Sequence, residues 1–197
     1  MNLNFYAPLR AIRAILPSMR LKGRGNIILI SSGAGFIARA GRATYSASKF
    51  AIEAAHEALS REVESFGNVK VLIVQPGAFA TGFVDTIVTP AAHEKTGGYS
   101  EGYKGTALEQ MVKMSRGEYG DGEGGAKLVL RGDPQKAADA IVSAVVNGHD
   151  YLRLMLGPDC VSAFEMKMDE LKRDFELTRD IAMSTDLDEF KGKESWS

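Results

Sequence analysis

Two short, almost uninterrupted apolar runs dominate the hydrophobic pattern of the chain. They are Asn26–Ile30 and Val69–Val74, and both are rich in β-branched residues. Runs of this kind are typical of central strands in a parallel sheet, which are buried on both faces. Between them, residues 44–66 have the length of a long helix, which Gly67 closes. The order strand, helix, strand predicts a right-handed crossover unit.

The rest of the pattern predicts three further helices and one strand. Apolar residues recur at helical spacing within residues 5–22, after the capping pair Asp133-Pro134, and from Phe164 onward. Residues 151–156 read as a third strand. We therefore expect an α/β fold with a parallel sheet of about three strands, in a single domain over residues 1–197, because no internal repeat or linker divides the chain.

Between residues 81 and 132 the pattern loses its periodicity and becomes rich in glycine. Loops of this length in a compact domain are usually lids or inserts, so we predict a loop insert over 81–132. Its glycines do not form a phosphate-binding loop, since no predicted strand leads into them and no Gly-Lys-Ser/Thr follows. Residues 185–197 are predicted to be a loose tail.

Composition and charge exclude several classes of protein. The 197 residues are 45% hydrophobic and 25% charged, with a net charge of −1, and the cations are scattered among acids, which argues against a nucleic-acid partner. No apolar run is long enough to span a membrane. The single Cys160 fits a reducing compartment, and a cytoplasmic location is expected. The three histidines are too dispersed to predict a metal site.

Candidate chemistry lies in three side chains. Tyr45 and Lys49 are four positions apart at the start of a predicted helix, and Ser32 ends the preceding strand, thirteen residues before Tyr45. Side chains at i and i+4 are neighbours on a helix, so the Lys49 ammonium can stabilise a phenolate at Tyr45. Ser32 lies at the strand end where open α/β sheets bind ligands. Together they predict proton transfer to or from a carbonyl oxygen that Ser32 holds.

These residues, with their context, resemble the short-chain dehydrogenase/reductase family from Asn4 to about Asp186. That family carries a serine, a Tyr-x-x-x-Lys motif, an upstream asparagine and a Pro-Gly segment beside the nicotinamide. The resemblance implies a partial, doubly wound Rossmann-type sheet, and NAD or NADP as cofactor. It implies an alcohol or carbonyl as small-molecule substrate, with the 81–132 insert helping to shape the substrate pocket. The implied catalytic residues are Asn4, Ser32, Tyr45 and Lys49; the cofactor-binding residues are Tyr45, Lys49, Pro76, Gly77 and Thr81; the substrate-binding residues are Ser32, Tyr45 and Phe79.

One part of the family pattern has no counterpart in this sequence. Neither the Thr-Gly-x-x-x-Gly-x-Gly loop nor the Asn-Asn-Ala-Gly segment occurs, and Met1 lies just before the helix that follows Asn4. We therefore expect an amino-terminally truncated member in which cofactor binding is impaired, because the pyrophosphate lacks its backbone N–H donors. The strand at residues 26–30 is expected to become an exposed, aggregation-prone sheet edge.

Three functional hypotheses follow. The first is an NAD(P)-dependent oxidoreductase that interconverts an alcohol and a carbonyl by hydride transfer. The second is a non-catalytic truncated fragment that is unstable or pairs with full-length relatives. The helices at 5–22 and 44–66 are the expected surface for such pairing or for a homo-oligomer. The third is an epimerase or dehydratase that uses the same Tyr/Lys pair and retains its cofactor through turnover.

Overall fold

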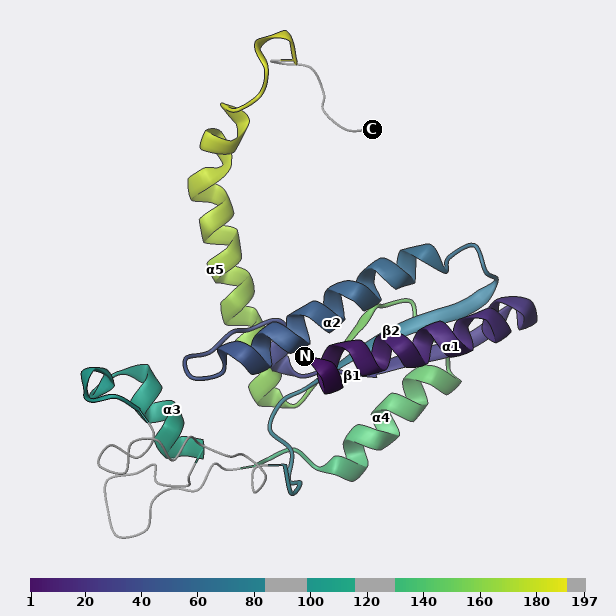
Figure 1. Ribbon diagram of the computed structural model, residues 1–197, viewed down its shortest axis with the longest axis horizontal. Coiled ribbons are helices and arrows are strands. Elements are labelled where there is room, and N and C mark those ends of the chain that lie inside the picture. Colours follow the sequence, from purple (N-terminus) through teal and green to yellow (C-terminus); the bar gives the residue numbers. More distant parts are fainter. Residues whose placement is uncertain (84–98, 116–129, 191–197) are drawn as a thin grey trace.

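The computed structural model describes residues 1–83, 99–115 and 130–190. Its centre is a parallel sheet of three strands, β1 (Arg24–Ile30), β2 (Asn68–Pro76) and β3 (Arg153–Leu156), in the order β1-β2-β3 (Figure 1). The full length of β1 pairs with β2, whereas β3 pairs only with the last four residues of β2. This α/β architecture with about three parallel strands confirms the prediction from the sequence.

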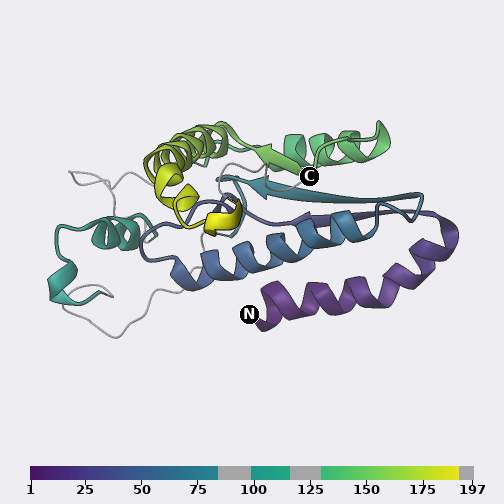
Figure 2. The same cartoon turned by 90° about the horizontal axis from the view of Figure 1, so that it is seen from above.

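Helices cover both faces of the sheet (Figure 2). On one face, α1 (Ala7–Lys22) and α2 (Ala43–Glu62) pack on β1 and β2, with Ile52 and Ile73 fully buried between them. On the other face, α4 (Pro134–Val146) packs on β2 and β3 through Ala144. The strand–helix–strand unit β1-α2-β2 therefore forms as its apolar pattern predicts.

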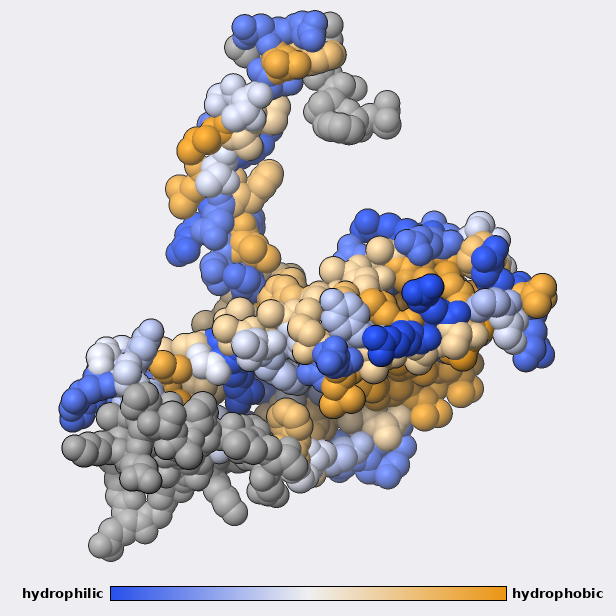
Figure 3. All heavy atoms as spheres, in the orientation of Figure 1, coloured by the Kyte–Doolittle hydropathy of each residue, from blue (hydrophilic) through white to orange (hydrophobic). Residues whose placement is uncertain are grey.

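The terminal helix α5 (Pro158–Met183) begins against the end of β3 and then leaves the body of the molecule (Figures 1 and 3). Only Cys160 and Phe164 are buried along it, and its projecting part mixes charged and apolar side chains. None of the described helices is both long and apolar enough to cross a membrane. Phe164 stacks on Phe36, with ring centroids 4.3 Å apart, and so attaches α5 to the loop after β1.

Several boundaries differ from the sequence predictions. Helix α1 follows a π-helical turn at Asn2–Tyr6 and continues through Pro17. Helix α5 starts six residues earlier than predicted, because Gly157 has a φ of 98° and Pro158 suits the first helical turn. Within the predicted insert, the short helix α3 (Ala107–Ser115) forms without having been predicted. Residues 84–98, 116–129 and 191–197 of the predicted insert and tail lie outside the described residues.

One edge of β1 has no neighbouring strand among the described residues. Its inward residues Ile27 and Leu29 pack under α1 and α2, but Ile28 and Ile30 on the opposite face are 40% and 53% exposed. In the part of the chain that the structure describes, α4 packs on β2 and β3, and these two isoleucines form an exposed apolar strip beside it. The expectation of an exposed edge strand therefore agrees with the architecture, and its tendency to aggregate is still a prediction.

Burial of His56 predicts a loss of stability in mild acid. His56 on α2 is 2% exposed, its Nδ1–H donates to the Ile52 carbonyl at 2.8 Å, and burial lowers its pKa below 6.5. The unfolded chain thus takes up a proton first as pH falls below about 6.5, and stability decreases by at most about 1.4 kcal/mol per pH unit. Urea unfolding at about pH 7.5 and pH 5.5 measures this loss. His56→Gln should remove this dependence of the free energy of unfolding on pH. If the variant loses as much stability as the wild type between the two pH values, the assignment to His56 is wrong.

Candidate active site

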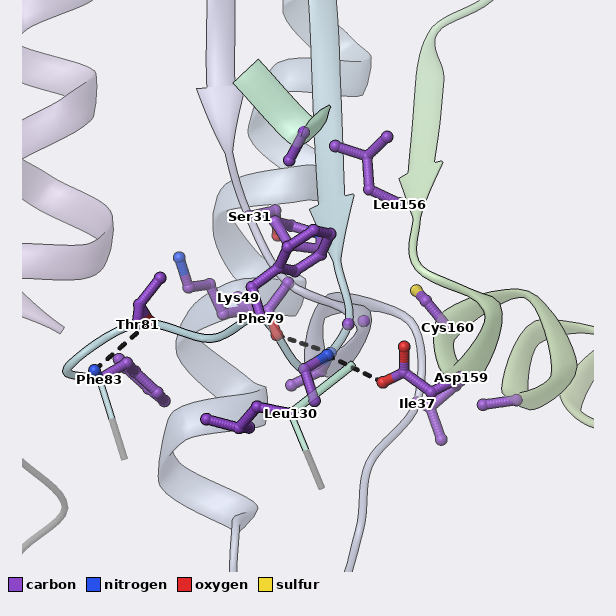
Figure 4. Close-up of a pocket in the computed structure, with 18 of the residues that line it drawn as sticks. Ser31, Ile37, Lys49, Phe79, Thr81, Phe83, Leu130, Leu156, Asp159 and Cys160 are labelled. Carbon is purple, nitrogen blue, oxygen red and sulfur yellow. Dashed lines mark hydrogen bonds between the residues drawn. The ribbon is translucent and has the colours of Figure 1, made fainter. Parts of the chain in front are cut away.

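A cavity of about 910 Å³ opens at the carboxyl edge of the sheet (Figure 4). Its wall combines the segment after β1, the first turns of α2, the segment after β2, helix α3 and the start of α5. Parallel sheets bind their ligands at this edge, where several strand ends and helix starts converge. Three of the four predicted catalytic residues, Ser32, Tyr45 and Lys49, line this one cavity.

Tyr45 and Lys49 occupy the first and second turns of α2. The Lys49 Nζ lies 5.9 Å from the centroid of the Tyr45 ring and donates a hydrogen bond to the Ile30 carbonyl at 3.1 Å. This bond fixes the ammonium beside the end of β1. Burial lowers the pKa of Lys49, and the nearby carboxylate of Glu53 opposes that shift.

Ser32 caps a 3₁₀ turn formed by Gly33–Gly35 directly after β1. Its Oγ accepts a hydrogen bond from the Ala34 N–H at 3.1 Å, and the residue lines the cavity. The bond uses one lone pair of the hydroxyl, so its proton can be donated to a ligand oxygen. The arrangement suits the predicted role of holding a carbonyl oxygen.

Asn4 is not among the residues that line the cavity. Its Nδ2 donates to Ser48 Oγ at 3.2 Å, and Ser48 Oγ in turn donates to the Tyr45 carbonyl at 2.7 Å. Asn4 therefore attaches the turn before α1 to the helix that carries Tyr45. Its catalytic role stays a prediction, because its described contact is with the helix and not with the cavity.

The end of β2 and the segment after it supply the remaining predicted residues, and Pro76, Gly77, Phe79 and Thr81 all line the cavity. Figure 4 shows how it is attached: the carboxylate of Asp159, from the first turn of α5, accepts a hydrogen bond from the Ala78 N–H at 2.8 Å. Phe79, the residue after Ala78, forms an isolated parallel β-bridge with Gly132. The sequence analysis missed Asp159, although an acid after the Gly-Pro pair at a helix start was a usable signal.

Gly77 and Asp159 should be energetically coupled. A Cβ added at Gly77 would lie 2.4 and 2.5 Å from the two carboxylate oxygens of Asp159. Gly77→Ala is therefore expected to displace the carboxylate from the Ala78 N–H and to cost about 1 kcal/mol, the usual worth of one hydrogen bond. Urea unfolding in a double-mutant cycle measures the coupling. Gly77→Ala should cost clearly less when Asp159 is already Ala, and equal costs in both backgrounds contradict the prediction.

A buried carboxylate, also missed from the sequence, lies beneath the cavity. Glu53 is 3% exposed; its Oε1 accepts from Ser31 Oγ at 2.5 Å and its Oε2 from Gln75 Nε2 at 2.8 Å. The Arg153 Nε lies 3.6 Å from Oε2. Burial raises the pKa of Glu53, and the bonds from Ser31, Arg153 and Gln75 oppose that shift. Glu53 thus joins α2 to the ends of β1 and β2 and to the start of β3.

Among the described residues, no group of three or more His, Cys, Asp and Glu side chains could hold a metal ion. The Cys160 thiol is buried, and burial raises its pKa to about 11. It is therefore not a nucleophile at neutral pH. The described site therefore has groups for proton transfer in Ser32, Tyr45 and Lys49.

Comparisons with known proteins agree with this geometry. The family described as "short chain dehydrogenase" matches residues 1–92. Over 158 residues, 80% of the chain, the sequence is 37% identical to "3-ketodihydrosphingosine reductase" of Bacteroides thetaiotaomicron and covers 53% of that protein. A crystal structure of a short-chain dehydrogenase from Streptomyces avermitilis superposes with a TM-score of 0.71 at 32% identity, covering 94% of this chain and 61% of the other. The chain belongs to the short-chain dehydrogenase family.

This family member spans about half the length of the curated relatives it matches, 53% in the case of the Bacteroides protein. A Burkholderia phymatum short-chain dehydrogenase in complex with NAD shares its fold at 18% identity, with a TM-score of 0.60 over 87% of this chain and 57% of the other. The described sheet is therefore part of a Rossmann-type fold, as predicted. The family assignment, drawn from the Tyr-x-x-x-Lys context, is confirmed.

Proposed function

We propose that this short-chain dehydrogenase interconverts an alcohol and a carbonyl by hydride transfer with NAD or NADP. The observation that carries the proposal is that Ser32, Tyr45 and Lys49 line one cavity at the carboxyl edge of the sheet. The names of its relatives support an oxidoreductase, and a solved relative in complex with NAD supports a nicotinamide cofactor. The substrate is a small-molecule alcohol or carbonyl, with Phe79 contributing to its pocket.

The residues present fit the nicotinamide end of such a cofactor. Lys49 would bind a ribose hydroxyl beside Tyr45, and Pro76, Gly77 and Thr81 line the same cavity. The cavity also falls in the ~300–1,000 Å³ range of small-molecule sites. The Thr-Gly-x-x-x-Gly-x-Gly motif that binds the pyrophosphate does not occur in the 197 residues, so weak cofactor binding by this chain is expected.

The chain's own groups would act on the carbonyl oxygen. When bound, the cofactor supplies or accepts the hydride. In reduction, the Ser32 hydroxyl donates a hydrogen bond to that oxygen and polarises the carbonyl. The Tyr45 phenol then transfers its proton to the oxygen, and the Lys49 ammonium stabilises the phenolate left behind. In oxidation, the phenolate accepts the alcohol proton.

Two measurements test this function. Absorbance at the reduced-nicotinamide band follows turnover with a panel of ketones and aldehydes, and calorimetric titration measures binding of NADH and NADPH. The proposal expects a cofactor-dependent absorbance change with at least one carbonyl and tighter binding of one of the two cofactors. No absorbance change with any carbonyl contradicts it. An epimerase or dehydratase would instead keep the cofactor tightly bound through turnover.

The second candidate is a chain that acts by pairing with another protein. It is favoured by the uncovered Ile28 and Ile30 of β1 and by the unpaired edge of that strand among the described residues. A homo-oligomer through α1 and α2 belongs to the same proposal. Light scattering over a range of concentrations distinguishes a monomer from a self-associated chain, and a strict monomer that binds and reduces carbonyls removes this candidate.

A further inference from the structure

Charged side chains are distributed unequally around the cavity. Among the described residues that line it, four are cationic, and the only acid is Asp159, which is bound to the Ala78 N–H. The cations are Arg39, Arg42, Lys49 and Arg131. The proposed function uses Lys49 and leaves the three arginines without a role. Within the part of the chain that the structure describes, these three form no ion pair.

Of the three arginines, Arg42 is the nearest to Tyr45 in the sequence. It is the N-cap residue of α2, three positions before Tyr45, and is only partly exposed. Burial lowers the pKa of Arg42, as does the nearby positive charge of Arg39, while Tyr45 opposes the shift. Two like charges, the partly buried Arg42 and the exposed Arg39, thus line the same cavity. An anion between them would offset both the desolvation and the mutual repulsion.

The first turn of α2 provides a second, independent observation. Ser46 is 2% exposed and lines the cavity, yet its buried Oγ has no hydrogen-bond partner among the described residues. Buried hydroxyls are nearly always hydrogen-bonded, so the Ser46 hydroxyl keeps an unused donor and acceptor in the cavity wall. The same turn carries no acidic residue, and a helix amino terminus attracts negative charge.

Resting on the proposed function, we propose that the substrate is a carbonyl compound that also carries a carboxylate, which Arg42 and Arg39 bind beside Ser46 and the first turn of α2. Arginine's planar fork matches a carboxylate with two parallel hydrogen bonds. The cavity wall also includes the apolar side chains of Met111 and Phe83. A substrate with an apolar body between its carboxylate and its reacting carbonyl would suit this lining.

The test compares 4-acetylbenzoate with its neutral methyl ester, two ketones that differ in one negative charge. Ligand-observed NMR titrations without cofactor measure both dissociation constants, so binding is determined independently of hydride transfer. The wild type should bind the acid at least about tenfold more tightly than the ester, as expected for hydrogen bonds to a charged group. Arg42→Met should abolish that preference and change ester binding less than about twofold.

Two further variants make the result specific. Arg39→Met, at an exposed position, should also reduce the preference, and circular dichroism verifies that each variant is folded. Arg61→Met is the matched control, because Arg61 lies near the other end of α2 and pairs with Glu57 on the surface. It should leave both constants unchanged.

The anion site is overturned if acid and ester bind equally, if neither binds, or if Arg42→Met leaves the preference intact. It is also overturned if Arg42→Met weakens NADPH binding without altering the preference, since the arginine would then hold a cofactor phosphate. A clear preference for the acid in a chain that turns over no carbonyl refutes the proposed function and leaves the anion site standing.

Discussion

Tyr45→Phe is expected to lower the rate of carbonyl reduction by at least about a hundredfold, the lower range for loss of a general acid. The substitution removes only the phenolic hydroxyl, and the ring can keep its packing against Phe83, 6.3 Å away between centroids. The KM for the carbonyl should change little, because Ser32 and the arginines remain. Initial rates at saturating and subsaturating substrate separate kcat from KM.

Tyr103→Phe is the matched control for this experiment, since Tyr103 is exposed and is not among the cavity-lining residues. Its rate should equal that of the wild type. If Tyr45→Phe retains wild-type kcat while the chain is active, the proton comes from another group. The hydride-transfer function would then survive without Tyr45 as its acid.

The fold and the central part of the site could be predicted because their signals are local in the sequence. The apolar runs at 26–30 and 69–74 identify β1 and β2, although α2 ends at Glu62, four residues before the end at residue 66 that Gly67 predicts. Tyr45 and Lys49 share one helix face, and Ser32 follows the strand just before that helix. No long-range information is needed to place these three residues near the same end of the sheet.

The missed features depend on contacts between distant segments. Glu53 lies on α2, and its partners Gln75 and Arg153 come from the distant strands β2 and β3. Its own sequence context resembles that of a surface acid on a helix. The sequence around Arg42 is that of an ordinary loop residue, and only the folded structure places it in the wall of the cavity. Helix α3 was missed because nine residues within a glycine-rich region provide too short a periodic signal.

The buried network predicts the largest effect on stability. Glu53→Ala is expected to lower the free energy of unfolding by about 3 kcal/mol or more, because it leaves Ser31 Oγ and Gln75 Nε2 buried without an acceptor and opens a cavity. Glu57→Ala is the control on the same helix: Glu57 also pairs with Arg153 but is more exposed, and its removal should cost about 1 kcal/mol or less. Urea unfolding of the three proteins measures the difference, and equal losses contradict the assignment.

Glu53→Gln separates the charge of this network from its shape. Burial raises the pKa of Glu53 above 4.5, so the folded state holds the carboxyl proton more tightly than the unfolded state does. The stability from that proton is fully present below about 4.5 and is lost as pH rises through the folded-state pKa. Unfolding free energies of wild type and Glu53→Gln should therefore diverge with increasing pH, in favour of the glutamine. A difference that is independent of pH means that the Ser31, Gln75 and Arg153 contacts offset the burial of the charge.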